Sequence, residues 1–195
     1  SVVSLNGYSV LKGFTIKNGA SNYGGGIYYD NSTAITESCI IKDNLSYSDG
    51  GGIYMRFSSP IVSNTIITEN TSNNFIGGGI LCEFQSNPQF INVIINKNFS
   101  SNGSAISSRY NSTPTLIHCN VLENDNQNND APIYLYDNST LTVLNSIIWT
   151  NQSQMAVMWD SPGPPSNFVV QNSVLRNGIN SVPSGNGTIT FLSGN

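Results

Sequence analysis

Short runs of alternating apolar and polar residues follow one another along this chain, and the same runs return about every 26 residues. An alternation with period two predicts a strand with one buried face, because successive side chains of a strand point to opposite sides. Each repeat holds three such runs, rich in β-branched residues and poor in strong helix formers. Inward-facing pairs of the three runs include Ile53 and Met55, Pro60 and Val62, and Thr65 and Ile67.

A glycine cluster marks the start of the first run in each repeat. Gly24-Gly25-Gly26-Ile27 returns at 50–53 and 77–80, and it decays to Gly103-Ser104-Ala105-Ile106. A repeat of this length cannot bury its own apolar face and must stack on its neighbours. We therefore predict an all-β solenoid, a single-stranded parallel β-helix of about seven coils of about 26 residues, with three short strands per coil.

A second mark is an apolar residue three positions before an asparagine. Stacked asparagines at a corner satisfy turn backbone groups and one another, so we predict an inward ladder. Its members are Asn18, Asn44, Asn70, Asn98, Asn124, Asn151 and Asn177. A second polar ladder is predicted between the second and third strands, at Ser38, Asn64, Asn92, His118, Asn145 and Gln171.

Two columns are predicted to face outward from the first strand. One carries charges whose sign alternates from coil to coil, at Asp30, Arg56, Glu83 and Arg109, so that each charge lies between opposite partners. The other is a strip of exposed aromatic and apolar groups that we predict to be a contact surface. The strip consists of Tyr28, Tyr54, Leu81, Tyr134 and Met158.

The unbroken repeat predicts one β-helix domain over residues 1–195, with irregular loops at 124–132 and 153–167. The second loop contains Pro162, Pro164 and Pro165, which cannot donate to a strand ladder.

Charge is scarce in this sequence. Only 9% of residues are charged and the net charge is −4, so nucleic acid and anionic membranes are not expected as partners. No apolar stretch approaches the ~20 residues that a membrane-spanning helix needs, and no membrane insertion is expected.

The paired marks Gly-Gly-X-Ile and apolar-X-X-Asn, over about residues 14–177, resemble those of the polymorphic outer membrane proteins and other bacterial β-helix repeat proteins. The resemblance implies a right-handed β-helix that is extracellular or displayed on the cell surface, as an adhesin or passenger domain. Ile or Val replaces the Phe that is usual in the second motif.

Enzymes such as pectate lyases also use this scaffold, with clustered carboxylates on one face. Glycoside hydrolysis needs two carboxyl groups ~5–9.5 Å apart, whereas Arg56 separates Asp30 from Glu83 here. His118 is the only histidine, and Asp125 and Asp130 are the best candidates for a Ca²⁺ site, without a supporting repeat. We predict no catalytic residue, metal or cofactor.

The favoured hypothesis is a non-catalytic extracellular β-solenoid with a structural, adhesive or surface-display role. Neither end has a clear polar cap, so we expect the coil ends to stack head-to-tail on other copies, or on further repeats of a longer chain. The alternative is a polysaccharide-binding module or pectate-lyase-like enzyme that contacts glycans, including cell-surface glycans, through Tyr28, Tyr54 and Tyr134.

Overall fold

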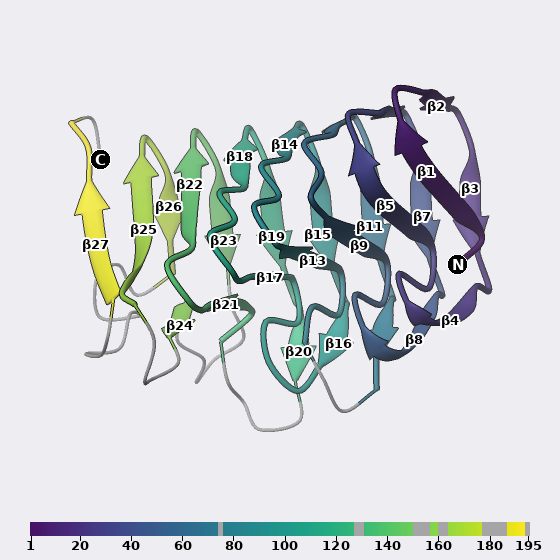
Figure 1. Ribbon diagram of the computed structural model, residues 1–195. Helices are drawn as coiled ribbons and strands as arrows, with labels where there is room; N and C mark the ends of the chain where they lie inside the picture. Colours follow the sequence, from purple (N-terminus) through teal and green to yellow (C-terminus); the bar gives the residue numbers. More distant parts are fainter. Residues whose placement is uncertain (74–75, 127–130, 150–156, 160–163, 177–186, 194–195) are drawn as a thin grey trace.

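The chain forms a parallel β-helix, in which successive coils pile up along one axis (Figure 1). The structure is a computed structural model and describes residues 1–73, 76–126, 131–149, 157–159, 164–176 and 187–193. The paired strands of the described residues all run parallel. No helix in this part of the chain is long and apolar enough to cross a bilayer.

The three predicted strands of each coil are confirmed, and they build three sheets that we name A, B and C. Sheet A contains β1 (Val3–Gly7), β5 (Ile27–Ser32), β9 (Ile53–Arg56), β13 (Ile80–Glu83), β17 (Ile106–Ser108), β21 (Ile133–Leu135) and β24 (Val157–Trp159). Sheet B contains β2 (Val10–Lys12), β6 (Ile35–Glu37), β10 (Ile61–Ser63), β14 (Gln89–Ile91), β18 (Thr115–Ile117), β22 (Thr140–Leu144), β25 (Ser166–Gln171) and β27 (Gly187–Phe191). Sheet C contains β3 (Thr15–Lys17), β7 (Ile40–Lys42), β11 (Ile66–Thr68), β15 (Ile94–Asn96), β19 (Asn120–Leu122), β23 (Ile147–Trp149) and β26 (Val174–Leu175).

A fourth set of short strands, sheet D, precedes the glycine clusters and was not predicted. It contains β4 (Ala20–Tyr23), β8 (Leu45–Asp49), β12 (Thr71–Ser72), β16 (Phe99–Ser100) and β20 (Asp125–Asn126). Three strands correct the predicted loops: β20 of sheet D lies within 124–132, and β24 of sheet A and the start of β25 of sheet B lie within 153–167. Residues 127–130, 150–156 and 160–163 lie outside the described part of the chain.

The isoleucines that follow the glycine clusters stack in one row, as the repeat predicts. Ile53 pairs with Ile27 and Ile80, and Ile106 pairs with Ile80 and Ile133. These side chains are fully buried inside the coil, together with Val62, Phe90 and Leu116 from sheet B. Burial of one such side chain contributes roughly 1.5–3 kcal/mol, so the continuous apolar column is the main stabilising feature of the fold.

The asparagine ladder is confirmed for Asn44, Asn70, Asn98 and Asn124, each at most 2% exposed. The Nδ2 group of Asn70 donates to the Oδ1 atom of Asn98 at 3.0 Å and to the carbonyl oxygen of Ile41 at 2.9 Å. The same pattern joins Asn44 to Asn70 and Asn98 to Asn124. The amides of Asn44, Asn70 and Asn98 therefore each connect their own coil to both neighbours.

The prediction for Asn18 was wrong. In the first coil Ile16 pairs with Ile41, so Gly19 takes the ladder position, and its N–H donates to Asn44 Oδ1 at 2.9 Å. Asn18 is exposed one residue earlier, with a φ of 58°. Asn151 and Asn177 lie outside the described residues.

A serine ladder, which the sequence reasoning missed, lines the turn between sheets A and B. The N–H groups of Ser32, Ser58 and Ser86 donate to the Oγ atom of the next serine at 3.0–3.1 Å. Ser139 and Ser166 continue the pattern at 3.2 Å. All members are buried. The hydroxyls of Ser58, Ser86, Ser112 and Ser166 satisfy backbone N–H groups of the turn, whereas Ser139 Oγ has no hydrogen-bond partner among the described residues.

The second predicted polar ladder is only partly formed. Ser38, Asn64, Asn92, His118 and Asn145 are exposed and adopt φ values of 50–54°, so this column marks a left-handed corner position. One hydrogen bond joins two of these side chains, from Asn92 Nδ2 to Asn64 Oδ1 at 2.8 Å. Asparagine tolerates that backbone conformation better than most residues, which explains its recurrence there.

Candidate functional site

The predicted contact strip lies in one column, but it is largely covered. Tyr54 pairs in register with Tyr28 and Leu81, and Tyr134 with Met158. Leu81 is fully buried, Tyr54 is 5% exposed and Tyr134 is 8% exposed, so the prediction of an exposed strip was wrong. Tyr28 is half-buried, and the Met158 side chain lies outside the described part of the structure.

The glycine clusters explain why this column is covered. A Cβ atom on Gly50 would lie 2.8 Å from the Cβ atom of Tyr54, and one on Gly77 would lie 2.8 Å from that of Leu81. Only the absence of a side chain lets the corner between sheets D and A fold over the outer face of sheet A. Together with Ile76, the covered residues form a second, smaller apolar cluster outside the coil.

A bulge in sheet D carries two side chains to the edge of this cluster. The pairing of β4 with β8 shifts between Ser21 and Tyr23, which brings Tyr23 opposite Asp49. β-Bulges redirect side chains and recur beside binding sites. Both residues line a pocket of about 300 Å³ on the outer face of sheet A. Its walls are Tyr23, Tyr28, Asp49, Tyr54, Arg56, Glu83, Phe84, Arg109 and Tyr110.

One ion pair flanks the pocket. The guanidinium of Arg56 donates from Nε to Asp30 Oδ1 at 3.0 Å and from Nη2 to Asp30 Oδ2 at 2.7 Å. This two-point hydrogen bond lowers the pKa of the Asp30 carboxyl below its usual range. The same guanidinium lies 5.8 Å above the ring of Tyr28, in cation–π geometry.

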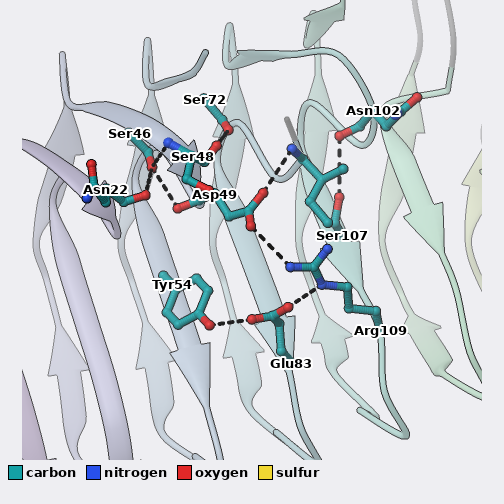
Figure 2. A network of polar contacts seen from close by, with 11 residues as sticks. Asn22, Ser46, Ser48, Asp49, Tyr54, Ser72, Glu83, Asn102, Ser107 and Arg109 are labelled. Atoms are coloured by element: carbon teal, nitrogen blue, oxygen red, sulfur yellow. Dashed lines mark hydrogen bonds and ion pairs between the residues drawn. The ribbon is translucent and has the colours of Figure 1, made fainter. Parts of the chain in front are cut away.

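A second, more buried network forms the floor of the pocket (Figure 2). Arg109 donates from Nε to Glu83 Oε1 and from Nη2 to Asp49 Oδ2, the latter at 3.1 Å. The Tyr54 hydroxyl donates to Glu83 Oε2, and the Ile76 N–H donates to Asp49 Oδ1 at 3.4 Å. Burial and the neighbouring Glu83 carboxylate raise the pKa of Tyr54. The network joins Tyr54 of β9, Glu83 of β13 and Arg109, which directly follows β17, to the corner that covers them.

Aromatic rings surround these charges. Tyr54 contacts Tyr23 and Tyr28 at ring-centroid distances of 5.2 and 5.3 Å. On another wall of the pocket, Phe84 stacks between Phe57 and Tyr110 at 5.4 and 4.9 Å. All three stacked residues have φ values of 49–56°, so they occupy a left-handed corner that aligns their rings. Their faces cover one another, which leaves Tyr23, 47% exposed, as the open aromatic surface at the pocket.

The predicted charge column is therefore confirmed as paired. Arg56, Glu83 and Arg109 line the pocket, whereas Asp30 lies outside its lining. Sequence reasoning missed Tyr23 and Asp49. Both directly precede the first glycine of a cluster, and that shared position is the signal that could have identified them.

Other candidates of the sequence lie away from the pocket. His118 is exposed at the sheet B–C corner, and the three cysteines are buried and unbonded to one another. Among the described residues no cluster of three or more His, Cys, Asp or Glu side chains could hold a metal ion. Asp130 lies outside those residues.

Several donors hold the carboxylates of the pocket in place. The two carboxylates that line the pocket accept hydrogen bonds from Arg109, and each accepts a further one from Tyr54 or the Ile76 N–H.

Comparison with known protein families identifies the family of this chain. Neither the curated proteins nor the solved structures yielded a significant similarity. A family profile described as "Right handed beta helix region" matches residues 77–195, which is more than half of the chain. The match agrees with the stacked parallel sheets and the buried ladders. The chain therefore belongs to the right-handed β-helix family.

Proposed function

We propose that the protein is a non-catalytic, extracellular adhesive β-helix that binds saccharide in the pocket on the outer face of sheet A. The observation that carries this proposal is the lining: four tyrosines and a phenylalanine surround arginine–carboxylate pairs. Tyrosine offers an apolar ring with a hydroxyl at its end, and a few placed polar groups in an aromatic pocket are typical of ligand sites. The resemblance to the polymorphic outer membrane protein repeats supports the extracellular setting.

A glycan array tests the binding role. We expect the wild-type protein to retain a subset of glycans and the Tyr23→Ala variant to lose them, because Tyr23 is the most open ring of the pocket. Tyr47→Ala is the matched control, since Tyr47 is 55% exposed, also lies in a sheet D strand, and does not line the pocket. Binding that survives Tyr23→Ala, or no binding at all, would contradict the proposal.

The non-catalytic part needs a separate assay. Incubation with neutral and acidic polysaccharides should release neither reducing ends nor unsaturated products. Turnover that disappears in a Glu83→Gln variant would instead make the pocket an active site.

A second role, end-to-end stacking, is favoured by the exposed core of the first coil. Val3 and Leu5 are half-buried, whereas their partners Ile27 and Tyr29 are fully buried. Val2, Tyr8, Val10 and Phe14 are 51–72% exposed in the same coil. We propose that another coil covers this surface, from a second copy or from further repeats of a longer chain. Analytical ultracentrifugation over a concentration series should show association that Leu5→Glu weakens, and a protein that stays monomeric throughout would exclude stacking between copies.

A further inference from the structure

The charges of the pocket identify the class of saccharide. Its lining contains two carboxylates, Asp49 and Glu83, and two guanidiniums, Arg56 and Arg109. Arg109 is engaged by both carboxylates, and Arg56 is engaged by Asp30 just outside the lining. The charge of each guanidinium is therefore already balanced by a carboxylate, so an anionic sugar could reach only the remaining N–H donors and would face Asp49 and Glu83 across a small pocket.

The hydrogen-bonding groups that face the pocket are mixed. A guanidinium has five N–H donors, of which the Asp30 pair uses those on Nε and Nη2 of Arg56. A carboxylate has about four lone-pair sites, and Glu83 receives one donor on each oxygen. Donors and acceptors side by side match hydroxyl groups, since each hydroxyl both donates and accepts.

We infer that the pocket takes an uncharged, polyhydroxylated sugar unit, such as the end of a neutral hexose chain, rather than a uronic acid polymer. This inference rests on the proposed saccharide-binding function and adds the charge class of the ligand. The volume of about 300 Å³ lies at the lower limit of ligand pockets, which fits a short terminal segment better than a long chain. Tyr23 supplies the ring against which the apolar face of the sugar packs.

Isothermal titration calorimetry with oligosaccharides of equal length tests the inference. The probes are neutral gluco-, manno- and galacto-oligosaccharides and oligogalacturonate, at low and high salt. We expect a neutral series to bind at least about tenfold more tightly than oligogalacturonate, which corresponds to about 1.4 kcal/mol. Its dissociation constant should change less than about twofold with salt, because screening acts only on charged partners.

A charge variant provides the second arm. Asp30→Asn leaves Arg56 without its carboxylate partner, so oligogalacturonate should bind several-fold more tightly while the neutral affinity is kept. Glu37→Gln is the matched control: it releases Lys12 from an exposed ion pair on sheet B, outside the pocket, and should change neither affinity.

The outcomes distinguish failure of the neutral-sugar inference from failure of the saccharide-binding function. Preferential binding of oligogalacturonate to the wild-type protein, lost in Tyr23→Ala, would overturn the neutral-sugar inference and leave the saccharide-binding function standing. An absence of binding to every probe, neutral or acidic, would remove the proposed function itself.

Discussion

At the scale of single residues, the fold is stabilised by buried polar side chains that form hydrogen bonds to the equivalent residue one coil away. The asparagine ladder and the serine ladder both use this principle, with a buried polar group that reaches the backbone of a neighbouring coil. The exposed corners use another property, the tolerance of asparagine for positive φ. A corner asparagine directly precedes a ladder serine in three tripeptides, Asn31-Ser32-Thr33, Asn111-Ser112-Thr113 and Asn138-Ser139-Thr140. Each tripeptide matches the acceptor pattern of N-glycosylation, but the fold accounts for it without that modification.

The buried ladder makes asparagine irreplaceable by its closest isostere. Asn70→Asp removes two donated hydrogen bonds and places carboxylate oxygens against Ile41 O and Asn98 Oδ1. We expect a loss of about 3 kcal/mol or more in the free energy of unfolding at neutral pH, by urea denaturation. The loss should shrink near pH 4, because protonation removes the buried charge. Asn92→Asp, at an exposed corner, should change stability by less than about 0.5 kcal/mol. Equal effects of the two substitutions would contradict the ladder's role.

At the scale of elements, the main feature is the covering on the outer face of sheet A. The glycine corners fold over its outer face, and the Arg109 network fixes them to the strands (Figure 2). Because Glu83 and Asp49 are at most 7% exposed, they depend on Arg109 for compensation.

Replacement of either arginine should therefore lower the stability by a different amount. Arg109→Met leaves two buried carboxylates without their cation and should lower the free energy of unfolding by about 3–5 kcal/mol. Arg56→Met breaks a more exposed pair, whose side chains are 43% and 22% exposed, and should cost less than about 1 kcal/mol. Thermal and urea unfolding of both variants measures the difference. A similar small loss for both would mean that the network does not hold the corner.

The strands could be predicted from the sequence wherever the same register repeats from coil to coil, whereas the pocket on sheet A could not. The glycine-isoleucine row and the inward pairs of sheets B and C follow directly from alternation. Asn18 was misplaced because Gly19 replaces asparagine in the ladder, so the usual mark is absent from the first coil. The pocket depends on the Ser21–Tyr23 bulge and on corners that cross over a strand face, and neither has a periodic signal. The serine ladder had one: Ser58, Ser86 and Ser112 each stand two residues before a proline.

At the scale of the whole molecule, buried tyrosines make the fold sensitive to alkali. Burial raises the pKa of Tyr29 and Tyr54 above the ordinary value of about 10. Between the unfolded and folded pKa values the folded chain binds more protons, so stability falls as the pH rises.

We expect each of these tyrosines to cost about 1 kcal/mol of stability by about pH 11, relative to pH 8. Urea denaturation at both pH values measures the change. Tyr29→Phe should flatten the dependence, although it also removes the buried hydrogen bond to Thr36 Oγ1. Tyr8→Phe, at a residue that is 72% exposed, should leave the slope unaltered. A slope that Tyr29→Phe does not reduce would contradict this assignment.

The identical hydrogen-bond pattern on the upper and lower side of each interior coil has a consequence for how such a chain can change its length. Duplication or excision of one entire coil would join surfaces that already match, so every ladder would close again across the new junction. Insertion of a single residue within a strand would instead displace glycine, serine and asparagine from their rows at once. This architecture can therefore lengthen or shorten over generations in whole layers, and it resists insertion of single residues within its strands.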